Sequence, residues 1–237
     1  MNAALILAGG RGERMLGLPV PKQFHPVRGR PLIAYALRRF QDCAAIGGFL
    51  VVAEEAWRAL IGEWLAREGV AKFLGFADPG ETRQESVFAG LLAMECLMKE
   101  DDVVLVHDAV RPAVTEALIL ACIEEARRRD GATPALRVRE TIYQSGDGRR
   151  VSALLDRDGL YIGQTPEGYR FGKYLAAHRS VTRAELAGMR GSSELAFRFG
   201  MDVGLFPGDE RNFKITTIED LERFERLAKK GEGYGAQ

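Results

Sequence analysis

Cysteine is scarce in this chain, which has 237 residues and three cysteines. Cys43, Cys96 and Cys122 are odd in number, widely separated and embedded in apolar helical patterns. Such spacing fits neither a disulfide framework nor a zinc site. We therefore expect three small core residues in a protein of the reducing cytoplasm.

Long hydrophobic runs are also missing, because nowhere do about 18 apolar residues follow one another without interruption. The start of the chain lacks the basic segment and apolar run of a secretory leader. Neither sign of charge is in excess, since 33 basic residues balance 33 acidic ones. These absences argue against a membrane span and against a general attraction to nucleic acid or an anionic membrane. Any strong positive field must be local.

The two best-known phosphate-binding motifs are absent as well. The pattern GxxxxGK[ST] does not occur, and GxGxxG would need a glycine where Met15 stands. Instead, the segment from Leu7 to Phe24 reads LAGGRGERMLGLPVPKQF and begins at the end of an apolar run. Its glycines allow a sharp turn that brings backbone N–H groups against phosphate oxygens, and Arg14 and Lys22 supply charge. An ordinary glycine-rich turn is the alternative, but the downstream PKQF favours a polyphosphate site.

Alternating strand and helix signals predict an α/β fold, with a Rossmann-like, mainly parallel sheet covered by helices on both faces. The length fits a single domain over residues 1–237. The expected strands are 3–7, 49–53, 72–75 and 103–106, and the expected helices are 31–43, 55–68, 82–98, 115–129 and one that begins near Thr217.

The alternation breaks after residue 138. A turn cluster at 145–148 separates two extended stretches, which predicts an excursion like a long β-hairpin over 139–162. Such an arm cannot bury both of its faces on itself, so we expect it to pack on a second subunit of a homodimer. The alternative is a loop that folds back on its own domain.

Parallel sheets bind ligands beyond the carboxyl ends of their strands. The glycine-rich loop leaves the strand 3–7 at that end, and His107 and Asp108 follow the strand 103–106. Asp108 is therefore well placed to hold magnesium, although it could instead cap the turn. We expect His107 to be a packed residue and not a base.

Five motifs follow one another along the chain: LAGGRGERM with PKQF, GETRQESV, HDAVRP, LLDRDG followed by QTP, and NFKIT followed by EDL. In this order they resemble the cytidylyltransferases that make CDP-alditols. The best-known branch acts on 2-C-methyl-D-erythritol 4-phosphate in the non-mevalonate isoprenoid pathway. A close relative acts on ribitol 5-phosphate for wall or capsule polymers. The resemblance spans residues 3–225.

The resemblance implies transfer of CMP from CTP to an alditol phosphate, with Mg²⁺ as cofactor and Asp108 beside the metal. The implied catalytic residues are Arg14, Lys22 and Lys214. The implied nucleotide-binding residues are Ala8, Gly9, Gly10, Gly12, Gly80, Glu81, Arg83 and Ser86. Binding of the alditol phosphate is implied for Arg111, Thr141, Arg157 and Thr165, partly from the arm of a dimer partner.

Four of these residues also have simpler explanations. Thr141 and Thr165 could be strand residues or turn caps. Arg157 could lie in a solvated turn, and Glu81 could serve only the helix dipole. The surrounding motifs favour a function for each.

Three segments depart from the family pattern. LAGG at 7–10 replaces the PAAG that is more usual in the methylerythritol branch, and Glu167 stands where glutamine is usual. Residues 190–193, RGSS, stand where many relatives carry Thr-Asp-acid. An acidic contribution is therefore missing there unless Glu194 supplies it.

The attacking phosphate oxygen of the acceptor is already anionic, so the reaction needs no general base. Its difficulty is repulsion between anions, which magnesium and fixed cations offset. The sequence therefore predicts a CTP-dependent cytidylyltransferase that acts on 2-C-methyl-D-erythritol 4-phosphate, with ribitol 5-phosphate as the alternative acceptor. A sugar-1-phosphate nucleotidylyltransferase and a nucleotide-binding regulator without turnover are alternatives from other classes.

Overall fold

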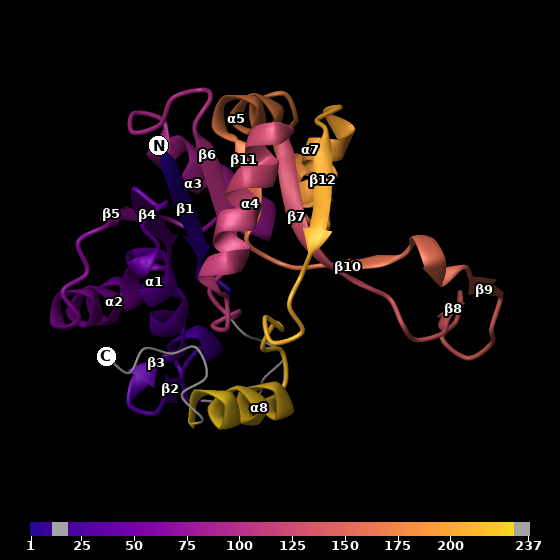
Figure 1. Ribbon diagram of the computed structural model, residues 1–237, viewed down its shortest axis with the longest axis horizontal. Helices are drawn as coiled ribbons and strands as arrows, with labels where there is room; N and C mark the ends of the chain where they lie inside the picture. Colours follow the sequence, from indigo (N-terminus) through magenta and orange to yellow (C-terminus); the bar gives the residue numbers. More distant parts are fainter. Residues whose placement is uncertain (11–18, 230–237) are drawn as a thin grey trace.

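An eight-stranded sheet organises the molecule (Figure 1). The computed structural model describes residues 1–10 and 19–229. The strands lie in the order β10-β7-β11-β6-β1-β4-β5, and β12 also pairs with β7. Their bounds are β1 Asn2–Leu7, β4 Gly48–Val52, β5 Phe73–Ala77, β6 Val103–Asp108, β7 Gly131–Arg137, β10 Tyr161–Gly163, β11 Glu167–Arg170 and β12 Val203–Pro207.

Most neighbouring strands of this sheet run parallel. β4 and β6 flank β1, β5 flanks β4, and β12 flanks β7, all in parallel. β11 runs antiparallel to both β6 and β7, and β10 runs antiparallel to β7. Gly131 and Ala132 pair with both β11 and β12, so these two strands lie on opposite sides of β7. The expected mainly parallel sheet is confirmed, and β11 is an insertion that the strand and helix alternation does not signal.

Helices cover both faces of the sheet because alternate strand residues point in opposite directions. Ala4 and Ile6 of β1 pack on the side of α1, α2 and α4, whereas Ala3 and Leu5 pack on the side of α3, α5 and α7. In Figure 1, α4 crosses in front of the sheet and α3 lies behind it. The helices are α1 Leu32–Asp42, α2 Glu55–Arg67, α3 Arg83–Met94, α4 Glu116–Arg128, α5 Phe171–Arg179, α6 Arg183–Ala187 and α7 Ser192–Arg198.

A smaller layer lies below the carboxyl ends of the strands (Figure 1). It contains α8 (Ile218–Lys229), the short helix η1 (Lys22–Phe24) and the ribbon of β2 (Pro26–Val27) and β3 (Arg30–Pro31). Tyr35 of α1 meets Phe224 of α8 edge to face, with ring centroids 5.0 Å apart. This apolar contact holds the C-terminal helix close to the sheet edge where the glycine-rich loop begins.

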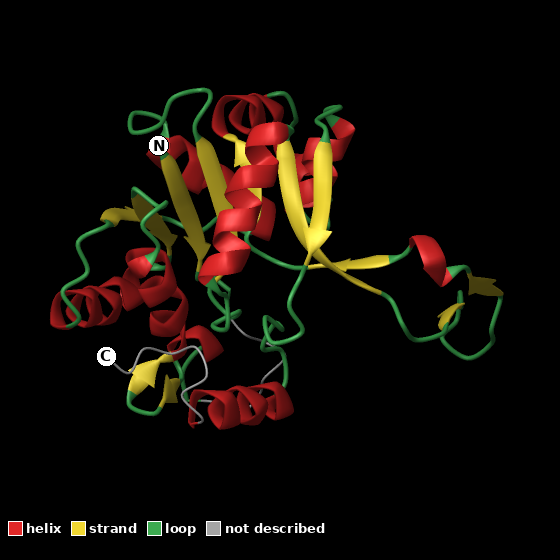
Figure 2. Cartoon of the chain, in the orientation of Figure 1, coloured by secondary structure: helices red, strands yellow, loops and turns green. Residues whose placement is uncertain are grey.

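The arm extends away from the sheet (Figure 2). It holds β8 (Ile142–Gln144), β9 (Ala153–Leu155) and the short helix η2 (Arg157–Gly159). Tyr143 and Leu154 are cross-strand partners and are 62% and 67% exposed. These two neighbouring side chains form an apolar surface on the arm that the rest of the chain leaves exposed.

The cysteines differ from one another in burial. Cys43 and Cys122 are buried core residues, as the sequence predicts, but Cys96 is exposed. The prediction for Cys96 is wrong because α3 ends at Met94 and not at residue 98, so Cys96 lies beyond the helical stripe. Across residues 1–10 and 19–229, no helix is both long enough and apolar enough to cross a bilayer.

We predict opposite stability effects for two helix glycines. A Cβ at Gly90 would lie 2.3 Å from Cδ1 of the buried Leu5, whereas a Cβ at Gly62 meets nothing within 4 Å. Overpacking costs about 1–3 kcal/mol and outweighs the ~1 kcal/mol that alanine gains in a helix. Gly90→Ala should therefore lower the free energy of unfolding in urea, and Gly62→Ala should raise it. Equal shifts in the two variants would contradict the close packing of α3 on β1.

Candidate active site

The first two strands of the site are neighbours in the sheet. Leu7 of β1 pairs with Asp108 of β6, and the backbone N–H of Ala109 donates to the carbonyl of Leu7 at 3.0 Å. The glycine-rich loop therefore leaves the sheet beside the Asp108 carboxylate, as the topology predicts. Gly12 and Arg14, predicted from the sequence, lie outside the described residues.

The start of the loop is packed against the segment that precedes α3. A Cβ at Gly9 would lie 2.4 Å from Cβ of Pro79, so only glycine fits this approach. The next residue, Gly80, donates its backbone N–H to Ser86 Oγ at 3.1 Å. The structure thus brings the predicted nucleotide-binding residues Ala8, Gly9, Gly80 and Ser86 into one region.

Gln23 holds the start of the glycine-rich loop through side-chain hydrogen bonds. Its Nε2 donates to the carbonyl oxygens of Ala8 and Gly10, each at 2.7 Å. Lys22, also predicted from the sequence, is buried beside it at the start of η1. Gln23 has a structural role that the sequence reasoning missed, although the PKQF motif contains it.

Three cations surround the buried carboxylate of Asp108. Lys214 Nζ lies 2.9 Å from Oδ2, and Arg111 Nε lies 3.9 Å from the same oxygen. Arg83 Nε and Nη2 each lie 3.1 Å from Oδ1. Burial alone would raise the pKa of the Asp108 carboxyl, but Arg83 and Lys214 outweigh burial and hold that pKa well below its usual range. Asp108 is therefore ionised at neutral pH.

Thr165 and His107 fix the backbone of Asp108. The Asp108 N–H donates to Thr165 Oγ1 at 3.1 Å, and His107 Nδ1 lies 3.2 Å from the same hydroxyl. Burial lowers the pKa of His107 to about 4, so the ring is neutral at pH 7. The Arg111 carbonyl can only accept, so the single proton of the neutral ring lies on His107 Nε2, which donates to that carbonyl at 3.0 Å. His107 Nδ1 therefore accepts from the Thr165 hydroxyl. His107 is a packed residue, as expected, and Thr165 belongs to the buried wall of the site.

The segment that carries Lys214 is held by its neighbour Asn212. The fully buried Asn212 side chain donates through Nδ2 to the Thr165 carbonyl at 2.8 Å. Arg111 Nη1 donates to the Asn212 carbonyl, also at 2.8 Å, and the Ile215 N–H donates to the Val110 carbonyl at 2.9 Å. These bonds place Lys214 beside Asp108, 106 residues away in sequence.

A second buried carboxylate lies near Arg83. Glu167 Oε2 is 3.6 Å from Arg83 Nη2, and Tyr169 donates its hydroxyl to Glu167 Oε1 at 3.3 Å. Ser192 Oγ accepts from Arg83 Nη1 and its hydroxyl contacts Glu167. Burial raises the pKa of the Glu167 carboxyl, and Arg83 opposes this shift. Glu194 instead accepts from the backbone of Arg190 and the side chain of Arg198, so the second acid at Arg83, besides Asp108, is Glu167 and not Glu194.

Three other residues from the sequence prediction lie apart from this cluster within the chain. Glu81 is exposed and pairs with Arg183 of α6 at 3.1 Å. Thr141 and Arg157 are exposed on the arm, where Arg157 donates to the Arg139 carbonyl. The structure does not bring these three to Asp108.

The single carboxylate of Asp108 fits a metal ion that takes its other donor oxygens from substrate phosphates and water. Among the described residues, no three acidic, histidine or cysteine side chains gather as a metal cage. Mg²⁺ commonly takes one or two carboxylates and completes its shell with substrate phosphates and waters. A single ionised aspartate beside the glycine-rich loop is compatible with that pattern.

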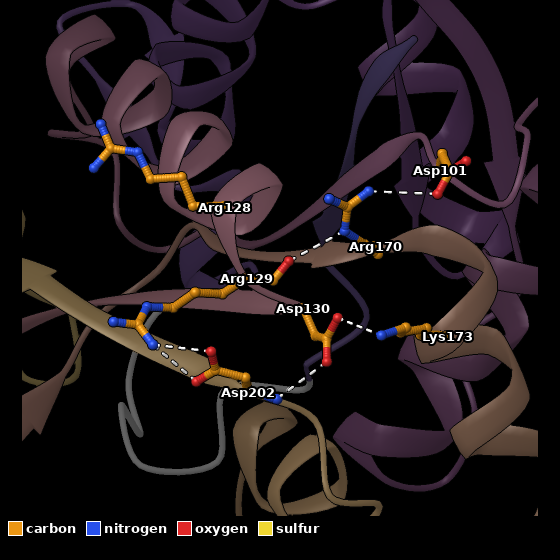
Figure 3. A pocket seen from close by; sticks show the side chains of 7 residues that line it. All are labelled: Asp101, Arg128, Arg129, Asp130, Arg170, Lys173 and Asp202. Carbon is orange, nitrogen blue, oxygen red and sulfur yellow. Dashed lines mark hydrogen bonds and ion pairs between the residues drawn. The ribbon is translucent and has the colours of Figure 1, made fainter.

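A different group of charges lies at the opposite end of the sheet, around an open hollow (Figure 3). It precedes the strands β6, β7 and β12, far from the carboxyl ends where ligands bind. The cations there have acidic partners: Arg128 with Glu124, Arg129 with Asp202, Lys173 with Asp130 and Arg170 with Asp101. We read this group as an ion-pair network that ties the strand starts together.

Comparison with known proteins supports the chemistry that this site suggests. A model of the 2-C-methyl-D-erythritol 4-phosphate cytidylyltransferase family matches residues 2–230. The chain is 33% identical to the ribitol-5-phosphate cytidylyltransferase of Streptococcus agalactiae serotype V, over 96% of this chain and 95% of that protein. It is 36% identical to the 2-C-methyl-D-erythritol 4-phosphate cytidylyltransferase of Geobacter metallireducens, over 92% and 93% of the two chains.

A solved structure agrees. The crystal structure of 2-C-methyl-D-erythritol 4-phosphate cytidylyltransferase from Francisella tularensis has a TM-score of 0.79 to this chain at 27% identity, and the match covers 95% of this chain and 99% of that one. The chain therefore belongs to the 2-C-methyl-D-erythritol 4-phosphate cytidylyltransferase family, and it is a CTP-dependent cytidylyltransferase.

Proposed function

We propose that the enzyme transfers CMP from CTP to 2-C-methyl-D-erythritol 4-phosphate and releases pyrophosphate. The observation that carries this proposal is the group of Arg83, Arg111 and Lys214 around Asp108, beside the glycine-rich loop. Ribitol 5-phosphate is the alternative acceptor, because relatives of both names match the chain at similar identity. LAGG and HDAVRP favour this alternative.

The residues of the site suit a reaction between two anions. The acceptor phosphate is already a nucleophile, and the neutral, buried His107 is not required to take a proton from it. Lys214 and Arg111, held by the Asn212 segment, reduce repulsion as the acceptor approaches. We assign Arg14 and Lys22 to the triphosphate. Fixed cations in a site with little water stabilise the charge that develops in the transition state.

A divalent metal is a general requirement of the family, and we propose Mg²⁺ for this enzyme. Asp108 would hold it together with the phosphates of CTP. The metal would neutralise charge on the α-phosphate during transfer. The nucleotide-binding residues in this proposal are Ala8, Gly9, Gly10, Gly12, Gly80, Glu81, Arg83 and Ser86.

We further propose that residues 1–237 act as one nucleotidyltransferase domain in a homodimer joined by the arm 139–162. The exposed pair of Tyr143 and Leu154 supports this, because a second subunit would cover it. In such a dimer, Thr141 and Arg157 of one arm would complete the acceptor site of the partner, together with Arg111 and Thr165. The free thiols fit the reducing cytoplasm, where we propose that the enzyme works.

The first prediction from the proposed function concerns the acceptor. With CTP and Mg²⁺, we expect pyrophosphate release to be faster with 2-C-methyl-D-erythritol 4-phosphate than with ribitol 5-phosphate in parallel assays. Faster release with ribitol 5-phosphate would select the alternative acceptor. Release with neither acceptor would refute the proposed function.

The second prediction concerns the lysines. Lys22→Ala and Lys214→Ala should each lower kcat by about 100-fold or more, because each removes a fixed charge from the transition state. Lys99→Ala is the matched control, since Lys99 is exposed at the opposite end of the sheet and should leave kcat unchanged. Circular dichroism would confirm that the variants are folded. Near-normal turnover in both site variants would overturn the assignment.

The third prediction concerns the arm. The double variant Tyr143→Ser, Leu154→Ser should sediment as a monomer and should raise KM for the acceptor more than KM for CTP. Leu120→Ser is a control, because Leu120 is 44% exposed on α4, outside the arm. A double variant that stays dimeric would show that the arm does not hold the dimer together.

A further inference from the structure

Glu167 is a buried carboxylate near Asp108 to which the proposed chemistry gives no role. It begins β11 and pairs with Val106 of β6, two residues before Asp108. Side chains two residues apart on a strand point to the same face, so Glu167 and Asp108 share the face that α3 covers. Arg83, the first residue of α3, reaches both carboxylates.

Arg83 is shared unequally between the two carboxylates. Its Nη2 is 3.1 Å from Asp108 Oδ1 and 3.6 Å from Glu167 Oε2. Its Nη1 donates to Ser192 Oγ, and the Ser192 hydroxyl also contacts Glu167. A small shift of the guanidinium would therefore exchange Asp108 for Glu167 while the bond to Ser192 stays in reach.

The two carboxylates depend on Arg83 to different degrees. Asp108 also has Lys214 and Arg111, so it remains compensated when Arg83 moves away. Among the described residues, Arg83 is the cation paired with Glu167. A buried charge without a partner is costly, so Glu167 depends on Arg83 more than Asp108 does.

We propose that Glu167 is a positioning residue that takes Arg83 from Asp108 when Asp108 binds the divalent cation that accompanies the nucleotide. This role rests on the proposed function. Arg83 Nε donates to Asp108 Oδ1 and Nη2 lies 3.1 Å from the same oxygen, so a divalent cation on that oxygen would repel the guanidinium at short range. Glu167 and Ser192 give Arg83 a second position that is still next to the nucleotide-binding segment 80–86.

The variant Glu167→Gln tests this role, since it keeps the size of the side chain and removes its charge. Arg83 should then stay on Asp108 and oppose the metal. With a nonhydrolysable CTP analogue present, we expect Mn²⁺ affinity, measured by electron paramagnetic resonance, to fall about tenfold. The KM for Mg²⁺ should rise, while kcat at saturating Mg²⁺ stays close to wild type. A purely structural partner of Arg83 would instead lower the melting temperature and leave Mn²⁺ affinity unchanged.

Two further variants complete the experiment. Glu194→Gln is the matched control, because Glu194 pairs with Arg198 and not with Arg83, and its Mn²⁺ affinity should match wild type. Ser192→Ala should weaken Mn²⁺ binding in the same direction but less. It decides the question if Glu167→Gln does not fold, and wild-type Mn²⁺ affinity in Ser192→Ala would then overturn the proposal.

The outcomes separate the two proposals. If the wild-type enzyme binds Mn²⁺ with the analogue and Glu167→Gln binds it equally well, the role of Glu167 is wrong and the proposed function stands. If the wild-type enzyme does not bind Mn²⁺ with the analogue, the proposed function fails and the role of Glu167 fails with it.

Discussion

The ionised carboxylate of Asp108, buried at the end of a central strand, is the constraint on which the rest of the site depends. A carboxylate removed from water costs several kcal/mol unless cations and hydrogen bonds compensate it. Arg83 from α3, Arg111 from the following loop and Lys214 from the C-terminal segment supply the cations. Residues from α3, from the loop after β6 and from the C-terminal segment therefore meet at the two carboxylate oxygens of Asp108. The geometry that compensates the charge also concentrates cations where polyphosphate chemistry needs them.

Charged side chains are arranged differently at the two ends of the sheet. At the amino ends of β6, β7 and β12, cations and carboxylates are matched in pairs, which suits a structural network. At the carboxyl ends, three cations surround two buried carboxylates, Asp108 and Glu167. An excess of positive charge that the fold already holds in place favours an anionic ligand, because the protein has met the cost of ordering these groups before the ligand arrives. The net neutrality of the chain conceals this local field.

Much of the fold could be predicted because its signals are local. The apolar run before Gly9 is β1, and the predicted helices 82–98 and 115–129 correspond to α3 and α4, which Thr82 and Thr115 cap. β11 gave no such signal, since its four residues include Glu167 and Arg170 and read as a polar loop. It becomes a strand because β6 and β7 offer unpaired backbone groups on both sides of it. Cys96 was misjudged for a related reason, since the apolar stripe of α3 continues in the sequence beyond the last helical residue.

The class of reaction could be predicted from the amino-acid sequence, because the short motifs LAGGRGERM, HDAVRP and NFKIT contain the glycine-rich loop, the aspartate at a strand end and the downstream lysine. Which second acid joins Asp108 at Arg83 depends on how the strands and helices pack. Sequence proximity favoured Glu194 as a replacement in the RGSS segment, but α7 directs Glu194 to Arg190 and Arg198. Glu167 reaches Arg83 because antiparallel pairing of β11 with β6 places it on the face of Asp108. Contacts between strands depend on register, and no local pattern of residues specifies the register of strands 60 residues apart.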